Sequence, residues 1–184
     1  ISEATANRVM EYAMKLDYQP NLIARSLNTG ETKTIGLILP SISDSFYSEI
    51  AREIENEARK KGYSLMICSS ESDIGREEEM IRLFKAKRVD GIIIAPTKRS
   101  KVEIQRLIDE SYPLVTIDRY FPELKASYII INNRDSSYML TKHLINKKCK
   151  KIAILTTNPH LTTMDLRREG FEDALRDSKI AVDS

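Results

Sequence analysis

The sequence predicts an α/β protein built on doubly wound parallel sheets, and two observations lead to this prediction. Short, nearly continuous apolar runs recur along the chain, which is typical of strands that are buried on both faces of a parallel sheet. Amphipathic helical patterns lie between most of these runs, at intervals of about 25–30 residues that suit βαβ units. Sheets of this kind bind ligands outside the carboxyl ends of their strands, so we expect a binding crevice there.

An amphipathic helix is expected first, over residues 2–16. Ser2 is a suitable N-cap, and apolar side chains recur at helical spacing behind it. The helix should end before Pro20, because the residue that precedes a proline avoids the helical conformation. A second, short helical segment is expected over 21–28, and a polar linker leads from it to Lys33.

Strands and helices then alternate to the end of the chain. The expected strands are residues 34–39, 64–68, 91–95, 113–117, 128–131 and 151–155. The expected helices are residues 44–61, 76–87, a stretch around Leu107, 136–146 and the later part of 161–177. This order predicts a helical N-terminal part, a first lobe and the incomplete start of a second lobe, over residues 1–30, 31–132 and 133–184.

Composition and motifs exclude several classes of function. The 29 Lys and Arg residues and 27 Asp and Glu residues leave a net charge of +2, so charge alone does not indicate a nucleic-acid partner. The six glycines form neither a dinucleotide fingerprint nor a P-loop, and no serine lies in a nucleophile elbow. His143 and His160 are not at metal-ligand spacing. We therefore predict no enzyme activity, no cofactor and no metal site.

The sequence contains no secretory signal and no apolar span long enough to cross a bilayer. A cytoplasmic protein without a membrane partner is therefore expected.

Polar and aromatic residues gather in three loops that follow expected strands. These loops are residues 40–47, 118–121 and 156–163, and Arg167 lies just beyond the last one. Because strand carboxyl ends meet at one edge of the sheet, the loops should line one crevice. Aromatic faces together with carboxylate and guanidinium groups suit a sugar or another small polar ligand. The alternative is that these loops are polar as surface loops generally are, and that Phe46 is a core residue at a helix start.

The most specific pattern of the chain runs from Tyr18 to Leu27 and reads Y-x-P-N-x-x-A-R-S-L. It resembles the hinge helix of bacterial repressors of the lactose-repressor and purine-repressor family. The resemblance implies a segment that binds the DNA minor groove, where an apolar wedge such as Leu27 can open a base step. The residues implied in this DNA-binding hinge are Tyr18, Asn21, Ala24, Arg25, Ser26, Leu27 and Asn28. A plain interdomain linker is the alternative.

Further segments resemble the sensor core of the same family. They are residues 33–40, 45–50, 61–63, 87–92 and the R-x-x-G-F element at 167–171. The resemblance implies the two-lobed fold of periplasmic sugar-binding proteins, with an effector between the lobes. It assigns Phe46 to the wall of the site, Asp118 to a polar clamp and Arg167 to a ligand-binding guanidinium. The predicted effector-binding residues are Phe46, Asp118, Arg119, Thr163 and Arg167.

The chain departs from the family pattern in three places. The usual Asp-Asn-x-x-Gly-Gly reads Asn-Asn-Arg-Asp-Ser-Ser over 132–137, which weakens any sugar-hydroxyl role for that corner. The first two headpiece helices of the family, which include its recognition helix, have no counterpart in the sequence. Neither do the rest of the second lobe and the returning strand of the first lobe. We therefore expect a fragment of a longer regulator, with a partial helical DNA-binding headpiece before a periplasmic-binding-protein-like sensor.

The leading hypothesis is a ligand-responsive, DNA-binding transcriptional regulator, in the form of a homodimeric repressor. Its expected partners are operator DNA, a small metabolite effector with a sugar favoured, and a second copy of the chain. The helices over 44–61 and 76–87 are expected to contribute to the dimer, the first through an outer face with Tyr47, Ala51 and Arg52. The alternatives are a solute-binding receptor without a DNA role and an enzyme on a doubly wound fold.

Overall fold

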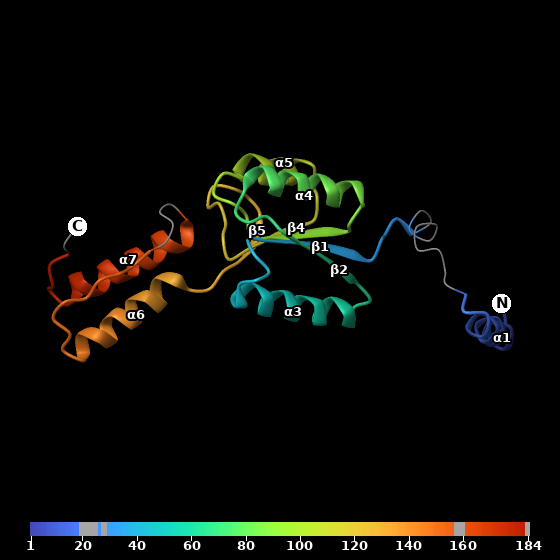
Figure 1. Cartoon of the computed structure of the whole chain (residues 1–184), viewed down its shortest axis with the longest axis horizontal. Helices are drawn as coiled ribbons and strands as arrows, with labels where there is room; N and C mark the ends of the chain where they lie inside the picture. The colour runs from blue at the N-terminus through green and yellow to red at the C-terminus, as the bar shows by residue number, and fades with distance from the viewer. Residues whose placement is uncertain (19–25, 27–28, 157–160, 183–184) are drawn as a thin grey trace.

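The computed structural model describes residues 1–18, 26, 29–156 and 161–182. Its centre is a five-stranded parallel sheet in the order β2-β1-β3-β4-β5 (Figure 1). The strands are β1 Thr34–Leu39, β2 Ser64–Ser69, β3 Gly91–Ile94, β4 Leu114–Ile117 and β5 Ser127–Ile129. The first five expected strands are thereby confirmed, with ends that differ by two residues at most.

Helices cover both faces of this sheet. Helix α3 (Ser45–Lys60) lies on one face, and α4 (Ile74–Ala86) and α5 (Lys101–Asp109) lie on the other (Figure 1). This arrangement confirms the doubly wound fold. Helix α1 (Glu3–Lys15) stands beyond one end of the sheet, and the pair α6 (Asn133–Asn146) and α7 (Thr162–Asp177) stands beyond the other. No helix in the described part of the chain is long and apolar enough to cross a membrane.

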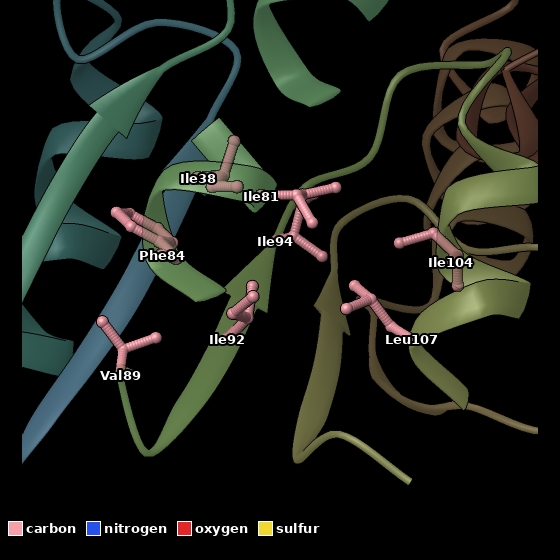
Figure 2. Close-up of a cluster of buried hydrophobic side chains, with 8 residues drawn as sticks. All are labelled: Ile38, Ile81, Phe84, Val89, Ile92, Ile94, Ile104 and Leu107. Atoms are coloured by element: carbon pink, nitrogen blue, oxygen red, sulfur yellow. The ribbon is translucent and has the colours of Figure 1, made fainter. Parts of the chain in front are cut away.

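The core has two layers because alternate side chains of each strand point to opposite faces. In β1, Ile38 faces α4 and α5, whereas Leu37 and Leu39 face α3. Figure 2 shows the larger layer, which comprises Ile38, Ile81, Phe84, Val89, Ile92, Ile94, Ile104 and Leu107. Removing each such side chain from water stabilises the fold by about 1.5–3 kcal/mol.

Helix α3 turns Ile50 and Ile54 towards the sheet, as expected, but a wider face of the helix packs there than the sequence suggested. Tyr47 and Ala51 are buried against the sheet, so the prediction that they lie on an outer face is wrong. Phe46, by contrast, is 43% exposed. Phe46 and Tyr47 are adjacent and fit the helical period almost equally well. Packing therefore decides which of the two lies on the face of the helix that meets the sheet. Of the predicted outer face, Arg52 is the residue that is exposed.

Residues 151–155 do not form the expected strand, so that prediction is wrong. A strand requires a neighbour to which its backbone can hydrogen-bond, and no strand lies beside this segment in the described part of the chain. Its apolar side chains instead line a cavity next to α6 and α7.

Helices α6 and α7 pack closely at Gly170. A β-carbon placed on Gly170 would stand 2.0 Å from the backbone oxygen of Arg134. Hydrogen bonds surround this approach: the Ser137 hydroxyl donates to the Arg167 carbonyl at 2.6 Å, and the Tyr138 hydroxyl donates to Asp177 at 2.9 Å. Ser137 occupies one of the positions at which the sequence departs from the family's Gly-Gly, and its hydroxyl ties the two helices together.

Candidate functional site

Two adjoining hollows lie at the carboxyl edge of the sheet, with volumes of about 270 and 250 Å³. Thr97, Lys98, Arg119 and Leu161 line both of them. The first two residues follow β3, Arg119 follows β4, and Leu161 is the N-cap of α7. The hollows therefore lie where a parallel sheet presents its ligand crevice.

Asp118 is held in place by a residue that the sequence did not single out. The Tyr47 hydroxyl donates to an Asp118 carboxylate oxygen at 2.8 Å. The Asp118 backbone amide donates to the Ile129 carbonyl at 3.0 Å, which joins the end of β4 to the end of β5. Burial, together with the neighbouring carboxylate, raises the pKa of Tyr47, so the phenol remains a proton donor. Tyr47 thus fixes the carboxylate that was predicted to clamp the effector.

The Arg119 guanidinium is largely buried but has few hydrogen-bond partners. Its side chain is 15% exposed, and its nearest carboxylate oxygen is that of Asp118, 3.6 Å from Nε. Nε is buried and has no hydrogen-bond partner among the described residues. Buried polar groups are rarely left without a partner, because such a group loses its hydrogen bonds to water. Because Arg119 lines both hollows, its guanidinium can reach an acceptor that enters either of them.

Glu77 lies fully buried on α4, behind this edge of the sheet. One of its carboxylate oxygens accepts the Thr97 backbone amide at 2.8 Å. Burial raises the pKa of Glu77, while nearby hydrogen bonds and the Arg119 charge oppose the shift. Glu77 therefore holds the loop that follows β3, from which Thr97 and Lys98 line the hollows. This role was not predicted, since Glu77 stands in a run of three glutamates that resembles a solvent-exposed helix face.

Replacing Glu77 by alanine is expected to lower the free energy of unfolding by about 1–3 kcal/mol, because the Thr97 amide loses its acceptor. Glu77→Gln keeps an acceptor oxygen, so it should change the free energy of unfolding little at acidic pH. The wild-type carboxyl, with its raised pKa, stabilises the fold most below the unfolded pKa near 4.5, and this contribution is lost as the pH rises through the folded value. The stability of Glu77→Gln relative to wild type should therefore increase with pH. Chemical denaturation from pH 4 to 8, with Glu79→Ala as the exposed control, measures both effects.

The other predicted effector residues, Phe46, Thr163 and Arg167, do not line the two hollows. Phe46 packs edge-on against Tyr47 with ring centroids 5.1 Å apart, and Thr163 is buried in the first turn of α7. Arg167 lines a separate cavity of about 630 Å³ between α6, α7 and the segment 152–156. Its Nε donates to the Asn133 side-chain oxygen at 2.8 Å. The structure therefore brings Asp118 and Arg119 together at the edge of the sheet, whereas Arg167 lies in another cavity.

The sequence also missed a contact between α7 and the sheet. The Thr162 hydroxyl donates to the Tyr120 carbonyl at 3.0 Å, and Thr162 lines the larger hollow beside Leu161. The first turn of α7 thereby forms one wall of the site. No cluster of His, Cys, Asp or Glu side chains among the described residues is suited to hold a metal ion.

The predicted hinge is described at two of its residues. Tyr18 is exposed, and the Ser26 carbonyl accepts the Gly30 amide at 2.9 Å. Gly30 has a φ of 74°, the left-handed conformation that commonly ends a helix. The other predicted hinge residues, Asn21, Ala24, Arg25, Leu27 and Asn28, lie outside the described residues.

Asp90 anchors the chain between the predicted hinge and the first strand of the sheet. One of its carboxylate oxygens accepts the Thr32 amide at 2.7 Å and the Thr32 hydroxyl at 2.9 Å. The other accepts the Lys33 amide at 2.9 Å. The residues before β1 are thus tied to the start of β3, which gives a physical role to the aspartate of the sequence element at 87–92.

Comparison with known protein families shows to which family the chain belongs. The family described as periplasmic binding proteins and sugar binding domain of LacI family matches residues 32–182. The chain belongs to this family. The match includes the whole sheet, both hollows and the pair α6 and α7.

Relatives within the LacI family are transcriptional regulators by name. The chain is 33% identical over 183 residues to the ribose operon repressor of Haemophilus influenzae, covering 99% of this chain and 54% of the relative. It is 35% identical over 185 residues to the HTH-type transcriptional regulator RegA of Clostridium saccharobutylicum, covering 100% and 55%. The chain thus spans about half the length of these relatives.

A solved structure of a transcriptional regulator is also similar. The Cra transcriptional dual regulator of Pseudomonas putida, in complex with fructose 1-phosphate, aligns with a TM-score of 0.73 and 31% identity. The alignment covers 78% of this chain and 54% of that one.

Proposed function

We propose that this chain acts in a ligand-responsive, DNA-binding transcriptional repressor whose sensor binds a small metabolite, with a sugar as the favoured class. One observation carries the proposal: the hinge pattern at 18–27 stands directly before a sensor fold of the LacI family that spans 32–182. The regulatory names of the relatives favour a repressor over a receptor without a DNA role, and over an enzyme. A complex of Cra with fructose 1-phosphate supports a carbohydrate-derived effector.

In the proposed site, Asp118 and Arg119 bind the effector from the sheet, and Phe46 forms a wall. Thr163 and Arg167 act from α7. An effector that contacts both the sheet residues and the α7 residues would favour one arrangement of α7 relative to the sheet. A ligand shifts the equilibrium between two arrangements by the difference in its affinity for them. The contact of Thr162 with Tyr120 supports this role, because it lies between the two groups.

The repressor is proposed to act as a cytoplasmic homodimer, in which two copies present paired hinge segments to operator DNA. We assign residues 1–30 to the headpiece and hinge, 31–132 to the first lobe and 133–184 to the start of the second. Helices α3 and α4 are proposed to contribute to the dimer through their solvent-facing sides. Asp90 supports a mechanical link between the hinge and the first lobe, since it holds the residues that follow the hinge against the sheet.

Replacing Leu27 by alanine in the full-length protein tests the DNA role of the hinge. Operator affinity should fall and the DNA bend should shrink, because an apolar wedge offsets the unstacking of a base step, which costs a few kcal/mol. Effector affinity without DNA should not change. The DNA for this test is selected from a random library by the purified protein. Gel-shift titration then measures operator affinity, and a bend assay measures the DNA bend. Val102→Ala, a truncation at an exposed position of α5, is the control. Unchanged affinity and bend in Leu27→Ala would remove the hinge from the mechanism.

A further inference from the structure

We propose that the ligand of the two hollows carries an anionic group, a phosphate ester or a carboxylate, which Arg119, Lys98 and Arg99 hold. This inference rests on the proposed function, because it specifies the chemistry of the effector at that site. It goes beyond a neutral sugar, for which hydroxyl-binding groups would suffice.

The charges that line the hollows favour an anion. Four cations line them, namely Lys98, Arg99, Lys101 and Arg119, against the two carboxylates Asp73 and Glu123. Both carboxylates are already engaged. Asp73 caps α4 by accepting the Arg76 amide at 2.8 Å, and Glu123 pairs with Lys101 at 2.6 Å.

Three cations therefore remain without a strong partner. Lys98 and Arg99 form no ion pair with any residue that the structure describes, and they are exposed at the mouth of the hollows. Arg119 contacts Asp118 only at 3.6 Å, and that carboxylate accepts a closer hydrogen bond from Tyr47. A guanidinium flanked by two exposed cationic side chains suits a phosphate or carboxylate, which can accept several charge-assisted hydrogen bonds.

Helix termini add positive potential at the same place. Ile74 at the start of α4, Lys101 at the start of α5 and Thr162 at the start of α7 all line the hollows. The first turn of a helix presents free amides and the positive end of its dipole, and both favour anions. The N-caps of α5 and α7, Ser100 and Leu161, make no side-chain capping hydrogen bond.

Arg119 also lacks hydrogen-bond partners at the hollows. Its Nε is buried and has no hydrogen-bond partner among the described residues. Thr97 lines both hollows as well, but its hydroxyl lies beside the buried Glu77 carboxylate. A guanidinium in this state points to a ligand that completes its hydrogen bonds. The two hollows together fall within the range of about 300–1,000 Å³ that small-molecule sites occupy.

Calorimetric titration of the full-length protein with inorganic phosphate and, separately, acetate tests the anion site. At least one of the two should bind saturably, with a dissociation constant below about 50 mM, and added sodium chloride should weaken it. Arg119→Gln should weaken that binding at least tenfold. The double variant Lys98→Gln and Arg99→Gln should do the same, and its exposed positions spare the fold. Arg106→Gln, an exposed cation elsewhere on α5, should bind like wild type.

Which of the two anions binds identifies the charged group of the ligand. Phosphate binding alone assigns a phosphate ester, and acetate binding alone assigns a carboxylate. Absence of saturable binding by both, or binding that both sets of variants leave unchanged, would overturn the inference. If a neutral sugar then still releases operator DNA, the proposed function stands without the anionic ligand. If an anion binds as expected but no ligand alters DNA binding, the anion site stands and the proposed function fails.

Discussion

Replacing Gly170 by alanine is expected to lower the free energy of unfolding by about 3 kcal/mol, near the upper end of the usual cost of overpacking. The new methyl group would stand 2.0 Å from the Arg134 carbonyl oxygen and 3.0 Å from the Tyr138 amide nitrogen. Both neighbours are backbone atoms of α6, so the two helices must move apart to admit it. The gain in helix propensity, about 1 kcal/mol from glycine to alanine, does not offset this.

Thermal or chemical denaturation of the full-length protein measures the Gly170→Ala effect. For a chain of 150–250 residues, a loss of about 3 kcal/mol corresponds to roughly 6–12 °C in Tm, and the shift is smaller in a longer protein. Gly75→Ala is the matched control, because Gly75 also lies in a helix and a β-carbon there would meet only the Asp73 side chain, at 3.3 Å. An equal Tm for wild type and Gly170→Ala would show that α6 and α7 do not pack as described.

Replacing Arg167 by alanine is expected to weaken effector binding by about 2–5 kcal/mol, the usual cost of removing one partner of a desolvated charged pair. Arg167 is half-buried in a mainly apolar cavity and forms no ion pair with the described residues. Asn133 accepts a hydrogen bond from its Nε, which orients the guanidinium and leaves its terminal nitrogens for a ligand.

The Arg167→Ala effect is measured by titrating an effector found in a thermal-shift screen of sugars, nucleobases and phosphorylated metabolites. Arg168→Ala is the control on the same helix, since Arg168 is exposed and lies near Asp165 and Glu172. The assignment would fail if the two variants bound the effector equally well, with the affinity of wild type.

The strands were predictable from sequence because each corresponds to a short apolar run. The runs of β1, β3 and β4 are largely buried, whereas β2 at one edge is only partly buried and β5 at the other edge is exposed. β1 was predicted to its last residue, and the parallel direction of β1 to β4 follows from the helices α3, α4 and α5 that connect them. The same signal failed at 151–155, which has the composition of a strand. An apolar run describes a segment that can be buried, but a strand also requires a partner backbone, and sequence does not report whether one is adjacent.

The site was only partly predictable. Asp118 and Arg119 follow an apolar run, so the rule for strand ends found them. Tyr47 was missed because its neighbour Phe46 fits the same helical pattern, and packing alone decides which of the two faces the sheet. Glu77 was missed because a buried glutamate and a solvated one look alike in a charged helix until the Thr97 amide is found beside it.

The central claim is that a small ligand and DNA bind one protein and alter each other's affinity. Fluorescence anisotropy on the full-length protein can measure the DNA dissociation constant with and without ligand, and calorimetry can measure the ligand dissociation constant with and without DNA. Linkage requires the same factor in both directions, typically about 5–150-fold for coupled sites. We expect such an equal factor, and we expect Leu27→Ala to weaken DNA binding without changing ligand affinity in the absence of DNA. Ligand and DNA that each bind without changing the affinity for the other would contradict it.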